Sequence, residues 1–309
     1  LDQFKFKLDF KKINFFLETS NPELFYQSLN IPIENIKVYL DFTSLIKSKP
    51  KIDKVNINSK VISVDQLKKI ILKTKPSNLN SLIINKVKNG KLTTNLELFF
   101  DEKFKVEDFI ATGEVTGMYA SLNNELSLEE TSFNFFADST DILIKNIESK
   151  TNGLIIKEGS LRIAKNNSII INSNFLSDVK INKKNIKNYS SQLNNNNYLN
   201  DNINFKGTFN HNLNITFDST YKLIDYTYES KANLNEFKLK FSKPIKIDII
   251  NDSINNLILK NTKLDIRYSS DKKNYVSAEG HFLKALKINS RDIDALIGAG
   301  VLYQNTGQL

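Results

Sequence analysis

Apolar residues recur at every second position through most of the chain, and this alternation constrains the fold more than any other feature. In KLTTNLELFF, for example, Leu96, Leu98 and Phe100 alternate with polar residues. The pattern repeats in LDQFKFKLDF, KVNINSKV, SIIINSNF, NINFKGTFNHNLNITF, EFKLKFSKPIKIDI and TKLDIRYS. Period two is typical of β-strands with one buried face. We therefore predict a mainly β, antiparallel fold of roughly a dozen or more strands joined by short polar connections.

Two segments interrupt the alternation and favour helices. Asn21 and Pro22 precede a short apolar stretch, so we predict a helix over PELFYQSL that is capped by Asn21. The second segment spans residues 63–89. There Ser63 is followed three residues later by Gln66, which is a capping box, and then by an apolar stripe.

The segment 63–89 contains a second helix start. Pro76 ends the first predicted helix, and Ser77 begins another that we expect to finish at Asn89, with Gly90 as its C-cap. We expect these two helices to form a hairpin that packs against the sheet. By contrast, residues 182–202 are polar and rich in Asn, which predicts a long mobile loop.

From about Tyr275 the period changes from two to 3.6. Small and large residues then fall at the offsets of the tetratricopeptide repeat, so residues 275–309 resemble part of that family. The positions that carry this packing pattern are Ala278, Phe282, Ala285, Leu296, Gly300 and Tyr303. The small side chains permit close helix approach, and the large ones fill the space between helices.

This tail holds only the second helix of one repeat and the first helix of the next. Repeats bury their faces by stacking, and about three are usually needed for stability. Three explanations stay open: more repeats follow Leu309, the tail packs on the sheet, or two unrelated pieces are joined. We expect a truncated or joined repeat beside a β-body formed by residues 1–274. The chain starts at Leu1, so we also expect a processed product or a fragment.

Composition excludes several functions. The net charge is +9 and the pI about 9.3, which fits phosphate or an anionic membrane, but also a plain solvated lysine face. Sequence-reading DNA proteins use Arg at base edges. Only Arg162, Arg267 and Arg291 are present, so we expect no nucleic-acid partner. The absence of Cys excludes disulfides, thiol catalysis and Cys–zinc sites.

No pattern of catalytic chemistry is visible. The chain has two histidines, His211 and His281, and neither has metal-ligating partners at a suitable spacing. His211 stands between Phe209 and Leu213 in the alternation, so we expect it to face inward as a structural residue. There is no nucleophile elbow, phosphate loop or dinucleotide fingerprint. We therefore predict a non-enzymatic protein with no catalytic, metal or cofactor site.

A sheet with one apolar face must cover that face. From the residues alone two arrangements stay open: the face packs on another sheet as an ordinary core, or it lines a groove that a ligand fills. The residues by themselves favour the packed core. No stretch approaches the roughly 20 apolar residues of a membrane-spanning helix.

Three stretches together suggest a family. They are PIENIKVYLDFTSLIKSKPKIDKVNINSKVISVDQL, FKVEDFIATGEVTGMYASL and SLEETSFNFFADSTDILIKNIESKTNGLIIKEGSLRI. Over roughly residues 1–275 the chain resembles the AsmA-like superfamily of Gram-negative envelope proteins. The resemblance implies an elongated, twisted, U-shaped antiparallel sheet with an apolar groove. It also implies a lipid bridge in the periplasm, tethered to the inner membrane by a segment that this chain lacks.

The resemblance favours the groove over the packed core. The candidate lining residues are the larger apolar ones of the alternating strands: Leu96, Leu98, Phe100, Phe133, Phe135, Ile169, Ile171, Phe205, Phe209, Leu213, Ile215, Phe217, Phe237, Leu239 and Phe241. We expect them to bind phospholipid acyl chains and so to serve lipid transfer between the inner and outer membranes, or envelope assembly. The alternative is a structural or adhesive β-protein that captures a protein partner through its repeat tail.

Overall fold

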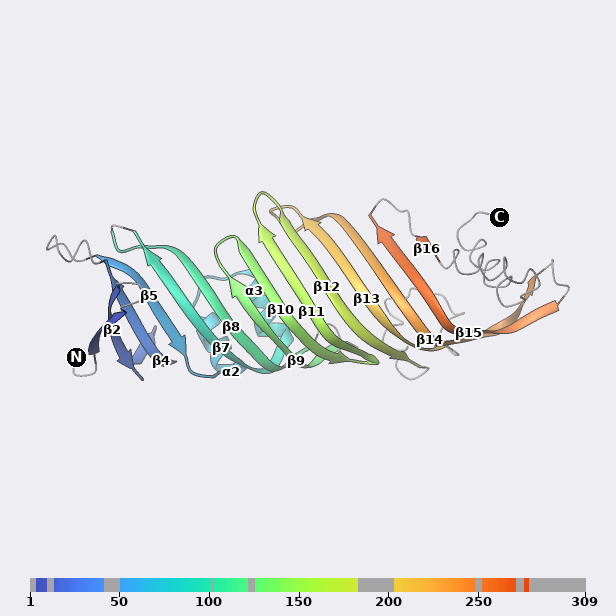
Figure 1. Cartoon of the computed structure of the whole chain (residues 1–309), viewed down its shortest axis with the longest axis horizontal. Helices are drawn as coiled ribbons and strands as arrows, with labels where there is room; N and C mark the ends of the chain where they lie inside the picture. The colour runs from blue at the N-terminus through green and yellow to red at the C-terminus, as the bar shows by residue number, and fades with distance from the viewer. Residues whose placement is uncertain are drawn as a thin grey trace. The chain divides into compact units, whose positions relative to one another are not determined.

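A computed structural model describes residues 4–9, 14–41, 51–101, 103–121, 126–182, 203–247, 252–270 and 275–277, and β-strands dominate them (Figure 1). The first strands are β1 (Phe4–Asp9), β2 (Asn14–Ser20), β3 (Glu23–Tyr26), β4 (Leu29–Leu40), β5 (Ile52–Ser59), β6 (Ile62–Ser63), β7 (Val87–Phe100), β8 (Val106–Ser121) and β9 (Ser127–Ala137). They are followed by β10 (Asp141–Thr151), β11 (Leu154–Lys165), β12 (Ile169–Ile181), β13 (Ile203–Phe217), β14 (Leu223–Ile247), β15 (Asp252–Ser269) and β16 (Tyr275–Ser277). The helices are α2 (Val64–Ile71) and α3 (Asn78–Lys86).

Strands that follow one another along the chain are mostly hydrogen-bonded neighbours. The order is β1-β2-β4-β5-β7-β8-β9-β10-β11-β12-β13-β14-β15-β16, while β3 pairs with β4 and β6 pairs with β7. The sheet is open and antiparallel, which confirms the prediction of a mainly β fold. Neither helix in the described ranges has the length and hydropathy of a membrane span.

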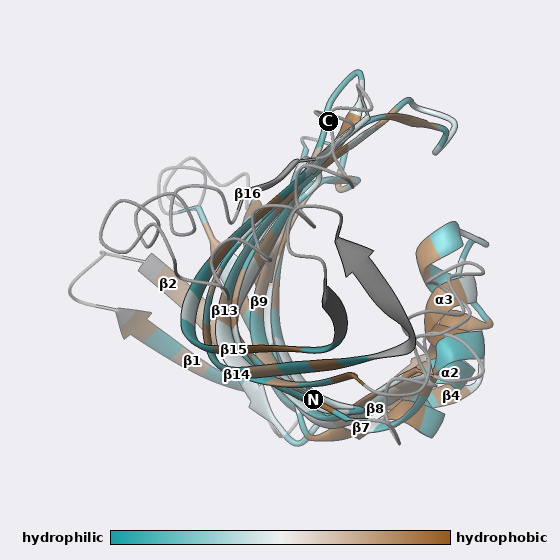
Figure 2. Cartoon of the chain, turned by 90° about the vertical axis from the view of Figure 1, so that its right-hand side faces the viewer, coloured by the Kyte–Doolittle hydropathy of each residue, from teal (hydrophilic) through white to brown (hydrophobic). Residues whose placement is uncertain are grey.

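The chain divides into two compact units. Unit 1 comprises residues 1–122 and 128–146, and unit 2 comprises residues 123–127 and 147–309. In unit 2 the long strands bend along their length (Figure 2), so its sheet has a concave and a convex side. The secondary structure described for unit 2 consists of strands alone, with no helix and no second sheet to form another layer.

The helical hairpin belongs to unit 1, and its prediction is confirmed. Ser63 Oγ accepts a hydrogen bond from the backbone N–H of Gln66, and the Gln66 side chain accepts one from the backbone N–H of Ser63 at 3.0 Å. The reciprocal pair satisfies two amides at the start of α2. The helix buries Val64, which joins Val87 and Ala120 in a small apolar cluster that anchors the hairpin on the sheet.

Two local predictions in unit 1 are wrong. The helix expected over PELFYQSL is instead the hairpin of β3 and β4, because Gln27 and Ser28 adopt positive φ angles of 46° and 67° and form a two-residue turn. Gly90 is not the C-cap of α3. That helix ends at Lys86, because Val87 is extended and already pairs with Ala120.

The tail is described only at its beginning. Tyr275–Ser277 form β16 and pair with β15, so these residues are strand and not the start of a helix. The positions predicted to pack as a tetratricopeptide repeat lie outside the described residues: Ala278, Phe282, Ala285, Leu296, Gly300 and Tyr303. The loop predicted over 182–202 also lies outside the described residues, except for Asn182.

The capping box gives the first testable prediction. Ser63→Ala removes the hydroxyl that accepts from Gln66, and an N-cap loss of this kind costs about 1 kcal/mol, or roughly fivefold in local opening. Native-state hydrogen exchange should therefore show faster exchange of the α2 amides. Lys69→Ala, on the exposed side of the same helix, is the matched control. Equal exchange in both variants would show that the cap does not hold this helix.

Candidate functional site: the apolar face of unit 2

The strand register of unit 2 gathers apolar side chains on one face of the sheet. Directly opposed residues of antiparallel strands project to the same side. Ile171 pairs with Ile215, which pairs with Tyr226, and Phe205 pairs in the same way with Phe237. The predicted groove residues that share this face are Ile169, Ile171, Phe205, Phe209, Leu213, Ile215, Phe217, Phe237 and Leu239. Their shared face confirms the alternation.

The opposite face of the same strands is polar. Asn210 pairs with Lys231, and Lys206 pairs with Glu236. The first three of these residues are exposed, and Glu236 is half-buried. On the apolar face, Phe209, Ala232 and Leu234 are all less than 9% exposed. The two faces of unit 2 therefore differ in both chemistry and burial.

The buried apolar side chains of this face form a cluster on the strands β12, β13 and β14. Val179, Ile181, Ile203, Phe209, Ala232 and Leu234 form its centre. Phe205 lies against it, with its ring centroid 6.2 Å from that of Phe209. Gly207 lies in the row between Val179 and Leu234. A Cβ there would come within 2.6 Å of the Asn233 carbonyl oxygen, so the close approach of β13 and β14 requires glycine.

A chain of polar side chains crosses this face. Ser177 Oγ lies 2.7 Å from His211 Nε2, and His211 Nδ1 lies 2.7 Å from the Tyr228 hydroxyl. Ser177 is 0% exposed and His211 is 6% exposed, whereas Tyr228 is only half-buried. The His211 ring is stacked between those of Phe175 and Phe209, at centroid distances of 4.4 and 5.8 Å. The expectation that His211 faces inward is confirmed.

Burial keeps this polar chain uncharged. It lowers the pKa of His211 to about 4, because an imidazolium would lose its hydration among aromatic rings. Burial also raises the pKa of Tyr228, and the nearby Ser230 hydroxyl opposes part of that rise. At neutral pH the apolar face therefore carries hydrogen-bonding groups without charge at its centre.

Unit 1 has an apolar face of its own. Leu96 pairs with Ile57 and Leu98 pairs with Val55, so both project to the same side of β7. Phe100 falls on that side by alternation. Phe133 and Phe135 are partly buried on either side of the exposed Asn134 on β9, and a Cβ on Gly113 would meet the Phe135 ring at 2.7 Å. The predicted residues of unit 1 thus form a second apolar surface.

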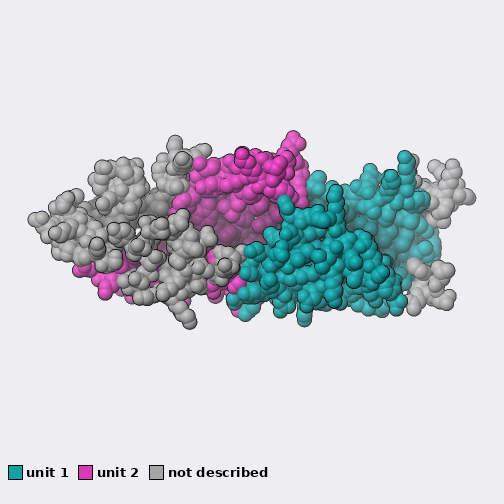
Figure 3. Space-filling view, turned by 180° about the vertical axis from the view of Figure 1, so that it is seen from behind, with its two compact units in different colours: residues 1–122, 128–146 teal, residues 123–127, 147–309 magenta. Residues whose placement is uncertain are grey.

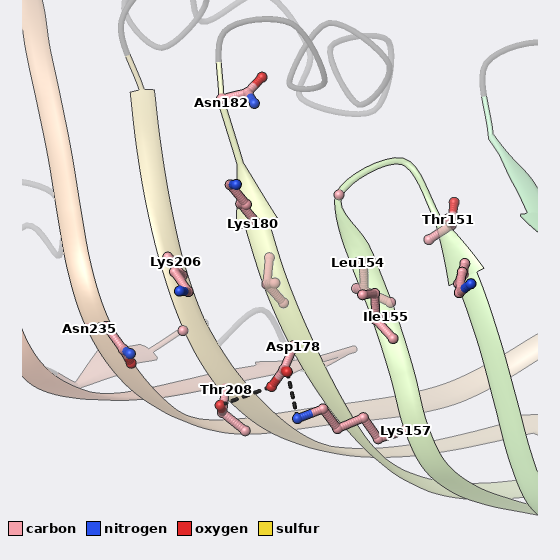
Figure 4. A pocket seen from close by; sticks show the side chains of 14 residues that line it. Thr151, Leu154, Ile155, Lys157, Asp178, Lys180, Asn182, Lys206, Thr208 and Asn235 are labelled. Carbon is pink, nitrogen blue, oxygen red and sulfur yellow. Dashed lines mark hydrogen bonds and ion pairs between the residues drawn. The ribbon is translucent and has the colours of Figure 1, made fainter.

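A pocket in unit 2 lies beside the apolar face but differs from it (Figure 4). Its volume is about 680 Å³. Inside it, Lys157 pairs with Asp178 at 2.5 Å, and the Thr208 hydroxyl donates to Asp178 at 3.1 Å. The Lys157 ammonium and the Thr208 hydroxyl lower the pKa of the Asp178 carboxyl despite some desolvation. Asp178 and Thr208 oppose each other on the polar face, whereas Leu154, Val179 and Gly207, which also line the pocket, belong to the row of the apolar face. The charged groups of the pocket thus lie on the polar side of the same strands.

The sequence missed some residues of the site. Tyr228, Ser230 and Ala232 alternate in YTYESKANL, and this stretch could have been recognised by its period of two. The contact between Ser177 and His211 could not have been predicted from the sequence, because the two strands are joined through residues 182–202 and their register is not visible in the sequence.

Phe241 lies in β14, but its side chain is outside the described part of the structure. In the described ranges no cluster of three or more His, Asp or Glu forms a metal site.

Comparisons of the chain with protein-family models, with curated proteins and with solved structures found no match. The resemblance to the AsmA-like superfamily and to the tetratricopeptide repeat stays a prediction.

The pKa of His211 predicts a pH-dependent stability. The folded-state pKa of about 4 lies below the ordinary value of 6.5, so the unfolded chain binds the proton more readily. The stability that depends on a neutral His211 is therefore fully present above about pH 6.5 and is lost as the pH falls toward about 4. Between about pH 7.5 and about pH 5 the free energy of unfolding should drop by about 2 kcal/mol on account of this residue.

Urea unfolding of the full chain at both pH values measures this loss. His211→Gln should reduce the pH dependence by about that amount, because Gln does not titrate. His281→Gln removes the other histidine and is the control. An unchanged pH dependence in His211→Gln would contradict the burial of a neutral imidazole.

Proposed function

We propose that this protein is a non-enzymatic phospholipid carrier of the bacterial envelope. Acyl chains lie on the apolar face of unit 2, and the bent sheet forms the wall of a groove around them. Its partners are phospholipid acyl chains and the envelope membranes, and its place is the periplasm. The observation that carries this proposal is the apolar face itself, which the register continues over the strands β11 to β15.

The extent of the apolar face supports a ligand. Monomeric proteins rarely expose apolar patches of more than a few hundred Å². Around the buried centre of this face, Leu213, Ile215 and Phe217 remain partly exposed. The rows of unit 2 run over five strands, from Leu154 on β11 through Val179 and Leu234 to Thr262 on β15. Each methylene group moved from water to such a surface contributes about 0.8 kcal/mol, so a long acyl chain is a strongly bound occupant.

The curvature of unit 2 supports a groove. Side chains on the concave side of a bent sheet converge and shield one another. Phe209 and Ala232 on the apolar face are shielded from solvent in this way, whereas their chain neighbours Asn210 and Lys231 on the other face are exposed. In the space-filling view unit 2 has a hollowed surface (Figure 3). We assign the apolar face to the concave side.

Charge favours a carrier that is indifferent to the headgroup. Lys206 and Lys231 lie on the face opposite to Phe209, so a phosphate beside the acyl chains would not reach them through the sheet. The headgroup then stays in solvent, and the acyl chains supply the affinity. The net charge of +9 instead favours contact with anionic membrane surfaces.

Lipid extraction tests the proposal directly. The full chain is expressed in a bacterial host, purified and extracted with organic solvent, and the extract is analysed by mass spectrometry beside an unrelated β-protein. We expect phospholipid in stoichiometric amount. A chain that carries no lipid would instead favour the structural or adhesive alternative with a protein-binding tail.

Photo-crosslinking locates the lipid on the sheet. Benzoylphenylalanine in place of Ile215 should crosslink to phospholipid, because this side chain projects from the apolar face. In place of Asn210, which is exposed on the polar face of the same strand, it should give little lipid adduct. The adducts are counted by mass spectrometry of the intact protein. Equal adducts at both positions would contradict a one-sided groove.

A further inference from the structure

Four polar side chains stand together within the otherwise apolar face of unit 2. Ser177, His211, Tyr228 and Ser230 come from the three adjacent strands β12, β13 and β14. The neighbouring positions on the same face hold apolar residues such as Phe209 and Leu213. Burying a polar group without a partner is unfavourable, so this cluster needs a physical reason.

Packing alone does not supply that reason. Ala232 lies two residues from Ser230 on the same side of β14 and is 3% exposed, so a small apolar residue suits this part of the strand. Ser230 is 0% exposed, and its Oγ makes no hydrogen bond of normal geometry in the described structure, although it lies close enough to the Tyr228 hydroxyl to lower the pKa of that group. A buried hydroxyl of this kind is costly unless something else satisfies it.

The hydrogen-bond chain leaves Tyr228 able to serve a ligand in two ways. If His211 carries its proton on Nδ1, it donates to the Tyr228 oxygen and accepts from Ser177, so the phenolic O–H is free to donate. If the proton is on Nε2, Tyr228 donates to Nδ1, and its oxygen can accept. Both tautomers are neutral and preserve the two 2.7 Å contacts. Tyr228 is also the least buried member of this three-residue chain.

The chemistry of the cluster selects the group that it binds. The cluster itself carries no charge at neutral pH, and the opposed residues of its row are the apolar Phe175 and Ile266. A phosphate or an amine would lose its hydration here without a counter-ion. A neutral acceptor such as a carbonyl oxygen needs only a hydroxyl donor, and Tyr228 and Ser230 are both donors.

We propose that Ser177, His211, Tyr228 and Ser230 form a hydrogen-bonding subsite for the ester carbonyls of a phospholipid, with the Tyr228 hydroxyl as the donor. This inference rests on the proposed function. It adds a directional hydrogen bond to a surface that otherwise binds acyl chains only by burying apolar area. The ester groups join the acyl chains to the glycerol backbone, so the subsite would fix how far each lipid slides along the strands.

A matched pair of lipids tests the subsite. Short-chain phosphatidylcholines of equal chain length, with two ester or two ether linkages, are titrated below their micelle concentrations into delipidated full chain by calorimetry. We expect the ester lipid to bind roughly two- to tenfold more tightly, because one neutral hydrogen bond is gained. Tyr228→Phe should remove this preference and leave the ether lipid unaffected.

Tyr221→Phe is the control. Tyr221 is exposed in the turn between β13 and β14, outside the proposed lipid surface, and its variant should keep the preference for the ester lipid. Equal binding of both lipids by the unaltered chain would overturn the subsite and leave the groove intact. Binding of neither lipid would overturn the carrier function together with the subsite. A preference that survives in a folded Tyr228→Phe variant would overturn the role of its hydroxyl, and Ser230→Ala then tests the second donor.

Discussion

The antiparallel backbone ladder is the constraint on which everything else in this protein depends. Each strand satisfies its amides and carbonyls on its neighbours, and the same pairing decides which side chains share a face. A slip of β13 by one residue against β12 would move Phe209 and Ile215 to the polar side and bring Lys206 and Asn210 to the apolar one. The correct register is therefore held by the whole row of apolar side chains and not by a single contact.

The strand register shifts at several β-bulges, and the apolar and polar faces of the sheet are preserved across them. The register of β13 and β14 shifts at Lys206 and Gly207, yet Phe205 still opposes Phe237 and Phe209 still opposes Ala232. The register of β11 and β12 shifts between Ile156 and Glu158, around the lysine that pairs with Asp178. Bulges of this kind bend a strand and increase its twist. Local curvature is thus added without exchanging the apolar and polar sides.

Local patterns of the sequence predicted local structure well. The alternation identified most of the strands, and the spacing of Ser63 and Gln66 identified the start of α2, because both depend on neighbours within a few residues. The helix expected after Pro22 failed because the turn at Gln27 and Ser28 closes a hairpin, and non-glycine residues at positive φ have little sequence signal. Pairing with β8 likewise overrode Gly90 as a cap.

The alternation predicted which face of the sheet a site residue lies on, but not which residues it contacts. Leu213 and Ile215 were assigned to one face from their spacing, and the face is as expected. The hydrogen bonds of His211 were not predictable, because Ser177 is 34 residues away and Tyr228 is 17 residues away, on two different strands. Sequence spacing within a strand says which face a residue takes, but only the register between strands says which residue it meets.

Neighbouring residues of β12 show how one strand separates two kinds of chemistry. Ser177 projects into the apolar face and contacts a neutral histidine, while Asp178 projects the other way, to a lysine and a threonine. A ligand on one face can reach the other only around the strand ends. Charged groups of the polar face therefore lie on the other side of the sheet from any ligand on the apolar face. Selectivity on that face must come from neutral groups, and burial keeps His211 in that state by holding its pKa at about 4.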